Sequence, residues 1–230
     1  NGKTITTANG TINITALNST TAANLSNITE TGSGSVTVTT AANVTFTGSF
    51  PDAVFTLSGA YTVTSNGSTI VSGKILTISN DTTLTTPAAD VNGKTITTAN
   101  GTINITALNS TAAADLSNIT ETGSGSVTVT TAANVTFTGS FPDAVFTLSG
   151  AYTVTSNGST IVLGKTLTIS SGCTLSSPIA DINLKTIAGA GNLSINGLNA
   201  SSTLSNITNT GTVTVTLLSS VTFTGSFPST

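Results

Sequence analysis

Four short stretches of alternating residues indicate the fold of this chain: Val36-Thr37-Val38-Thr39, Val44-Thr45-Phe46-Thr47, Tyr61-Thr62-Val63-Thr64 and Leu76-Thr77-Ile78-Ser79. In each stretch apolar residues alternate with threonine or serine, which is typical of a β-strand with one buried face. Three shorter runs continue the pattern: Phe55-Thr56-Leu57, Thr69-Ile70-Val71 and Thr83-Leu84-Thr85. Turn-forming groups such as Ser65-Asn66-Gly67 separate the runs. The sequence therefore predicts many short strands and no helix.

The even spacing of these strands favours a β-solenoid. Strand centres stand about eight to ten residues apart, so a coil of two or three strands needs about 18–25 residues. Strands in such a fold pair from coil to coil in parallel, and parallel crossovers favour a right-handed path. Inward residues such as Val38, Phe46, Val63 and Ile78 would form apolar ladders. We therefore predict an all-β protein, a right-handed parallel β-solenoid.

A tandem repeat supports this architecture. Residues 1–91 and 92–182 differ at only 11 positions, and a more divergent third copy begins at Asn183. We divide the chain into one repeat at 1–91, a second at 92–182 and a partial third at 183–230, all within one continuous solenoid. A sandwich would close its sheets inside one domain, and the chain lacks the tryptophan of common propeller repeats. Phe46, Phe137 and Phe223 share one sequence context and are predicted to point inward.

The composition excludes several classes of protein. Thr, Ser and Asn occupy 105 of the 230 positions, charged residues make up 6%, and His, Met, Trp and Arg are absent. The usual general base of an enzyme is therefore missing. A net charge of −3 with five lysines gives no basic face for nucleic acid. No stretch approaches the roughly 18 apolar residues of a membrane span. We expect a protein that is not an enzyme and that has no cofactor, metal or nucleic-acid partner.

The acidic residues and the cysteine suggest structural positions. Asp52 and Asp81 stand among turn-forming residues, and Glu30 stands alone before Thr31-Gly32. Asp81 is replaced by Gly172 in the second repeat, whereas Asp90 recurs as Asp181. A turn role is favoured over a calcium ligand for Asp90, and a catalytic pair of carboxylates is not favoured. The single Cys173 cannot form an internal disulfide, and it is interpreted as a small residue of a strand or turn.

The asparagines raise the question of glycosylation. Eight of the nine Asn in residues 1–91 begin the pattern Asn-x-Ser/Thr. A turn Asn that precedes a Thr-rich strand produces this pattern without any sugar, and this interpretation is favoured. An exposed turn in a secreted protein can nevertheless accept a glycan. The candidate glycosylation sites are Asn13, Asn18, Asn27, Asn43 and Asn66.

The repeated Thr-x-Thr runs suggest a second hypothesis, an ice-binding surface. Thr37 with Thr39, and Thr62 with Thr64, would each place two hydroxyls and two methyls on one face. Any Thr-rich strand gives such pairs, and their spacing along the sequence is uneven. A regular ice-matching lattice needs one spacing, so ice binding is not favoured.

The chain as a whole resembles a known group of proteins. Tandem Thr/Ser/Asn/Gly-rich repeats with Val-Thr-Val-Thr strands, few charges and a single cysteine are similar to the β-solenoid stalks of large bacterial surface proteins. Adhesins of the filamentous-haemagglutinin and autotransporter types are the nearest examples. The resemblance implies an extracellular, extended and non-catalytic role. The Gly-Gly-x-Gly-x-Asp repeats of calcium-dependent secreted proteins are absent.

The expected function is a structural one, an extracellular repeat segment that forms a rigid stalk, sheath or filament at the cell surface. We expect the molecule to continue in both directions and to self-associate, end to end or laterally, because neither end shows a cap and few charges oppose packing. Two other readings remain open. One is an adhesive module that binds surface glycans, and the other is a carbohydrate-active β-helix enzyme.

Overall fold

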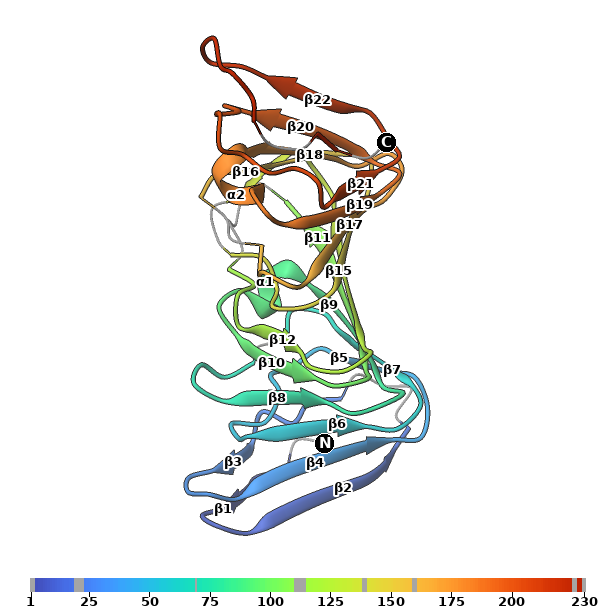
Figure 1. Ribbon diagram of the computed structural model, residues 1–230. Helices are drawn as coiled ribbons and strands as arrows, with labels where there is room; N and C mark the ends of the chain where they lie inside the picture. Colours follow the sequence, from blue (N-terminus) through green and yellow to red (C-terminus); the bar gives the residue numbers. More distant parts are fainter. Residues whose placement is uncertain are drawn as a thin grey trace. The chain divides into compact units, whose positions relative to one another are not determined.

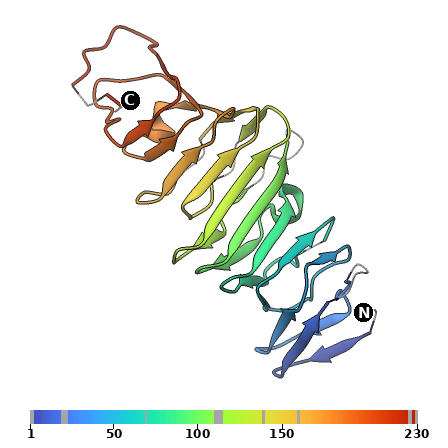
Figure 2. The ribbon, with the colours of Figure 1, turned by 90° about the vertical axis from the view of Figure 1, so that its right-hand side faces the viewer.

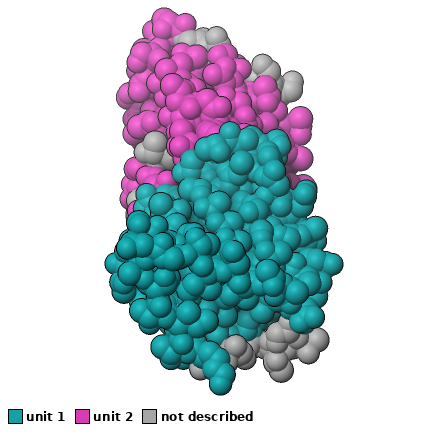
Figure 3. All heavy atoms as spheres, turned by 90° about the horizontal axis from the view of Figure 1, so that it is seen from below, with its two compact units in different colours: residues 1–105, 118–127 teal, residues 106–117, 128–230 magenta. Residues whose placement is uncertain are grey.

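The structure is a computed structural model that describes residues 3–18, 23–68, 70–109, 115–137, 140–158, 161–224 and 227–228. The chain forms two compact units, one made of residues 1–105 and 118–127 and the other of residues 106–117 and 128–230 (Figure 3). We call them unit 1 and unit 2. Their division does not coincide with the boundaries of the sequence repeats.

Unit 1 is built of short strands and one helical turn (Figure 1). Its elements are β1 (Ile5–Thr7), β2 (Thr11–Leu17), β3 (Ile28–Glu30), β4 (Ser35–Thr40), β5 (Val44–Phe46), β6 (Phe55–Ser58), β7 (Thr62–Ser65), β8 (Ile75–Ile78), β9 (Thr83–Pro87), α1 (Ala88–Val91), β10 (Thr95–Thr98) and β12 (Ile119–Glu121). Six of these strands form a sheet in the order β12-β10-β8-β6-β4-β2. A second side carries the run β5-β7-β9, and β1 pairs with β3.

Unit 2 repeats this design. Its elements are β14 (Val135–Phe137), β15 (Phe146–Ser149), β16 (Thr153–Ser156), β17 (Thr166–Ile169), β18 (Thr174–Pro178), α2 (Ile179–Ile182), β19 (Thr186–Gly189), β20 (Asn192–Asn196), β21 (Ile207–Asn209) and β22 (Val213–Thr216). One sheet has the order β14-β16-β18-β20-β22, and another side carries the run β15-β17-β19-β21. The strands β11 (Thr102–Leu108) and β13 (Ser126–Thr131) contain residues of both units.

The strands pair in parallel from coil to coil, as the sequence predicts, so the protein is a parallel β-solenoid. Each strand of the six-stranded sheet lies beside a strand one coil away, as the labels β2, β4, β6, β8, β10 and β12 in Figure 1 show, and Figure 2 views the chain from the side of β7 and β9. Paired residues stand between 18 positions apart, as for Thr174 and Asn192, and 24 positions apart, as for Thr11 and Ser35. These are the coil lengths expected from the strand spacing.

The core of unit 1 is a set of ladders of inward apolar side chains. Val38 pairs with Leu57, and Leu57 pairs with Ile78, on three successive coils. All three side chains are fully buried, while the residues next to them along each strand are half-buried. Each such side chain contributes about 1.5–3 kcal/mol by leaving water. The alternation in the sequence therefore sets which face of each strand forms the core.

The predicted inward phenylalanines are confirmed for two copies. Phe46 and Phe137 are buried, whereas Phe223 is half-buried and contacts the exposed Phe227. Phe46 also belongs to a row of three rings, because Phe50 lies 4.9 Å from Phe46 and 5.2 Å from Phe55 between ring centroids. The second repeat has the equivalent row Phe137, Phe141 and Phe146.

The 91-residue repeat is not a whole number of coils. In the six-stranded sheet of unit 1, each of these residues pairs with the next one, one coil further along: Ile12, Val36, Phe55, Leu76 and Ile96. The path from Ile12 to Ile96 therefore takes four coils. The residue equivalent to Ile12 in the second repeat is Ile103, which lies in β11, outside that sheet. In the same way β1 and β10 have the same sequence Ile-Thr-Thr, yet they belong to different sheets of unit 1. The same sequence thus occupies different sides of the solenoid in successive repeats.

The structure corrects two local expectations. The helical turns α1 and α2 follow Pro87 and Pro178, where the sequence predicted no helix. The expected strand at residues 69–71 is absent at Ile70 and Val71, while Thr69 lies outside the described residues. Ile70 is buried there without being part of a strand, so this apolar side chain packs in the core but its backbone takes no part in strand pairing.

Candidate functional site

Two acids and a lysine from three successive coils of unit 1 meet at one place. Lys74 Nζ lies 3.8 Å from Glu30 Oε2 and 3.8 Å from Asp52 Oδ1, and it donates a hydrogen bond of 3.1 Å to the backbone oxygen of Glu30. We call these three residues the Glu30 cluster. Glu30, which stands alone in the sequence, thus shares a lysine with Asp52 in space, and Asp52, which was expected in a turn, forms a bridge with Thr29 of the coil before it.

The backbone ladder positions the two acids. Thr29 and Asp52 form a parallel bridge, in which Glu30 N donates to Asp52 O at 2.8 Å and Asp52 N donates to Ile28 O at 2.9 Å. Glu30 ends β3, and Asp52 lies one coil further along the chain. Because the ladder locks both backbones, the two carboxylates are each held within 3.8 Å of the lysine amine of the next coil.

The Glu30 carboxylate is buried and anchored. Its side chain is 1% exposed, and Oε1 accepts hydrogen bonds from the backbone N–H groups of Gly32 and Gly34. A Cβ atom at either glycine would overlap a backbone oxygen of the preceding coil, Ala8 O or Gly10 O. The turn after β3 therefore needs glycine, and two of its backbone N–H groups donate to the Glu30 carboxylate. The side chains of Lys74 and Asp52 are more open, at 25% and 43% exposed.

An aspartate, half-buried at Asp90 and buried at Asp181, stabilises each helical turn. Asp90, in α1, accepts hydrogen bonds from Ser65 Oγ at 2.7 Å and from Ser68 N at 3.0 Å. Its counterpart Asp181, in α2, accepts from Ser156 Oγ at 2.8 Å and from Gly158 N at 3.1 Å. The aspartate thus ties a helical turn to the coil before it, whereas the sequence predicted a turn at Asp90. Asp81 adopts a left-handed φ of 63°, and Gly172 adopts 88° at the same place in the next repeat, so this position is a turn.

The candidate glycosylation sites all lie on the surface. Asn13 is an exposed residue within β2, and Asn18, Asn27, Asn43 and Asn66 are exposed beside strand ends. The residues Ser19 and Thr20 of the Asn18 sequon lie outside the described residues. The Oδ1 atom of Asn43 accepts a 2.9 Å hydrogen bond from Thr62 N on the next coil. This asparagine therefore has a structural role of its own, while its Nδ2 atom, where a glycan would be attached, does not take part in that bond.

The outward threonines form an aligned ladder in spite of their uneven sequence spacing. Five of them pair in register across the six-stranded sheet of unit 1: Thr37, Thr56, Thr77, Thr97 and Thr120. The coils differ in length, but turns absorb the difference and the strands stay in register. The hydroxyls of Thr77 and Thr97 lie 3.2 Å apart and are hydrogen-bonded to each other. The ladder therefore satisfies part of its own hydrogen-bonding capacity.

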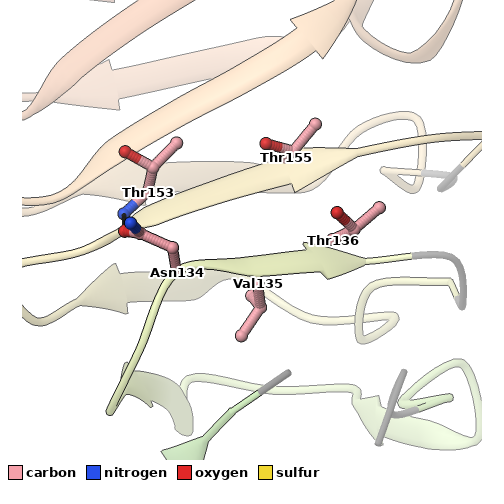
Figure 4. A pocket seen from close by; sticks show the side chains of 5 residues that line it. All are labelled: Asn134, Val135, Thr136, Thr153 and Thr155. Carbon is pink, nitrogen blue, oxygen red and sulfur yellow. Dashed lines mark hydrogen bonds between the residues drawn. The ribbon is translucent and has the colours of Figure 1, made fainter. Parts of the chain in front are cut away.

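A shallow polar concavity of about 490 Å³ lies on unit 2, along β14 and β16. Asn134, Thr136, Thr153 and Thr155 line it, and Asn134 Oδ1 accepts a 2.8 Å hydrogen bond from Thr153 N (Figure 4). Val135 points to the opposite side of the strand, into the core. The concavity contains neither an acid nor an aromatic ring, so it offers hydroxyl and amide groups alone.

Cys173 is a buried free thiol in the position that Thr82 occupies in the first repeat. Burial raises the pKa of the thiol, which is only partly offset by a hydrogen bond from the backbone of Thr174. A thiol with a raised pKa is a poor nucleophile, since the thiolate is the reactive form. The interpretation of Cys173 as a packing residue fits this environment.

Within the residues that the structure describes, no group of three or more acids, cysteines or histidines could hold a metal ion. The helices in that part of the chain are too short to cross a membrane. Comparison of the chain with protein-family models, with curated proteins and with solved structures finds no match.

Proposed function

We propose that this chain is a structural, non-catalytic repeat segment of an extracellular surface protein, in which stacked coils form a rigid stalk, sheath or filament. The observation that carries the proposal is the combination of parallel coil-to-coil pairing with neutral outward ladders in nearly identical repeats. A backbone paired in this way has few exposed hydrogen-bonding groups along its sides, which opposes both bending and proteolysis. Stacked like charges would repel at every coil, and Thr, Ser and Asn avoid this.

Self-association belongs to the same proposal. The charged residues that normally keep surfaces apart amount to 6% of the chain. Unit 2 also exposes the apolar side chains Leu217, Leu218 and Phe227. A surface of this kind favours lateral or end-to-end packing between copies. A secreted location would also make the exposed asparagines, Asn13, Asn18, Asn27, Asn43 and Asn66, available for glycan attachment.

Electron microscopy of the native protein, purified without denaturant, tests the proposal. We expect extended particles or bundles that survive limited proteolysis with a broad-specificity protease. Compact, monodisperse particles that are rapidly degraded would reject the structural role. Treatment with a glycan-releasing enzyme, followed by intact-mass measurement, tests the glycosylation of the surface asparagines.

An adhesive role is the second candidate, and the polar concavity beside Asn134 is the observation that favours it. Hydroxyl and amide groups can hydrogen-bond the hydroxyls of a sugar. Binding of the folded chain to a panel of surface glycans tests this role, with Thr153→Val and Thr155→Val as the variants that remove the hydroxyls. Binding that is equal in the variants and the original chain would assign adhesion to another surface.

A further inference from the structure

The Glu30 cluster brings an amine, a carboxyl group and a buried carboxylate together in a fixed arrangement. We propose that Lys74 and Asp52 form an intramolecular amide bond between Nζ and Cγ, and that Glu30 accepts and returns the proton that the reaction moves. The bond would join two successive coils covalently. It is a modification site independent of the structural role proposed above.

The contacts assign a different role to each acid. Glu30 Oε1 is tied by two backbone N–H groups, and its side chain is almost completely buried, so this carboxylate is fixed in place with Oε2 toward the Lys74 amine. Asp52 makes no side-chain hydrogen bond with the described residues besides its ion pair with Lys74. Its carboxyl carbon is therefore the group that is free to accept the nitrogen. The lysine amine is already held by the backbone oxygen of Glu30.

The reaction balances without a co-reactant. The Lys74 ammonium gives one proton to Glu30, and the lone pair of Nζ then forms a bond to Asp52 Cγ. One Cγ–O bond of Asp52 breaks, and its electron pair leaves with the oxygen. Of the three ammonium protons, one remains on the amide nitrogen, and two leave with that oxygen as water, one of them returned by Glu30. Nothing is oxidised or reduced.

The fold supplies the proximity and orientation that free groups lack. Separate amines and carboxylates in water stay ionised and apart. Groups held in a reactive geometry behave as if each were present at an effective concentration of about 10⁵–10⁸ M. Here the ladder hydrogen bonds between Glu30 and Asp52 lock two of the three backbones. The third, at Lys74, is tied by its own N–H group to Val71 O at 3.2 Å.

The second repeat keeps all three residues of the group, and the third copy has neither acid. Glu30, Asp52 and Lys74 follow one another at intervals of 22 residues, and Glu121, Asp143 and Lys165 do the same in the second repeat. In the third copy Asn209 replaces the glutamate, and Ser229 stands where the aspartate would be. Asn209 is buried at this position, with its amide nitrogen donating to Gly191 O. If each acid served only its own position, a repeat could keep one acid without the other. The third copy instead lacks both.

Intact-mass spectrometry of the natively purified and then denatured chain tests the proposal. We use the variant Lys165→Arg so that only the first cluster can react. Its mass should be about 18 Da below that of the sequence, one water lost by condensation. Trypsin should also fail to cut after Lys74, which gives a peptide of residues 4–94 that carries the same loss.

Three further variants in the Lys165→Arg background sharpen the test. Lys74→Arg and Glu30→Gln should each restore the full mass, whereas Lys94→Arg, which changes a lysine outside the cluster, should keep the loss. A full mass for the Lys165→Arg chain, with cleavage after Lys74, would overturn the proposal and leave an ion pair. Retention of the loss in Glu30→Gln would overturn the role of Glu30 as the proton acceptor.

Discussion

Replacing Phe50 by alanine should destabilise unit 1 by about 4–5 kcal/mol. Phe50 is 1% exposed and lies at the centre of the row of three rings, between Phe46 and Phe55. Removal of a buried phenylalanine side chain costs about 3–5 kcal/mol, since the core cannot collapse fully around the cavity. Each of its two ring pairs adds about 0.5–1.5 kcal/mol to the native state. We therefore place Phe50→Ala in the upper half of the range for such substitutions.

Hydrogen exchange measured by mass spectrometry separates the effect on unit 1 from the rest of the chain. Amides of β4 and β6 should exchange faster by the factor that corresponds to the lost free energy, because exchange reports local opening. Two controls are available in the chain. Phe141→Ala removes the equivalent ring of the second repeat and should loosen unit 2 instead. Phe227→Ala removes a ring that is 66% exposed and has one ring partner, Phe223, so it should change stability by less than about 1.5 kcal/mol.

A small effect of Phe50→Ala would refute this reasoning. If the amides of β4 and β6 lost less than about 1 kcal/mol of protection, the three rings would not be a continuous part of the core. An equal effect of Phe50→Ala and Phe227→Ala would contradict the inward register of the strands around them. Either result would also remove the basis for the apolar ladders.

Three further changes follow from the same contacts. Thr56 and Thr77 are paired on adjacent coils, so replacing both by lysine should destabilise the fold by up to about 1 kcal/mol more than the sum of the two single variants. Added salt should reduce this excess, as measured by urea unfolding. Asp90→Ala should lower the free energy of unfolding by about 3 kcal/mol, because it removes two hydrogen bonds to a carboxylate. An unchanged melting temperature in calorimetry would contradict this anchoring role of Asp90. Because burial raises the pKa of Cys173, the unfolded chain ionises first as the pH rises above about 8.5, so stability should fall there. The variant Cys173→Thr, which carries the residue of the first repeat, should not show that fall.

The sequence by itself determined the architecture, because the information is local. Alternation of apolar residues with threonine specifies which side chains point inward, and strand spacing specifies the length of a coil. For this reason the parallel pairing and the burial of Phe46 and Phe137 could be predicted. The turn at Asp81 could be predicted from its turn-forming neighbours, and Asp81 and its counterpart Gly172 both adopt a left-handed φ.

Only the tertiary structure decided which residues meet across coils. Coil lengths vary between 18 and 24 residues, so the turns set which side chain lies above which. Glu30, Asp52 and Lys74 are separated along the chain, and they meet because pairing places their coils next to one another. Their equal spacing of 22 residues is the signal that could have revealed the cluster, but it becomes meaningful only when the register is known. The position of a repeat on one side or another of the solenoid also depends on register, because 91 residues do not complete a whole number of coils.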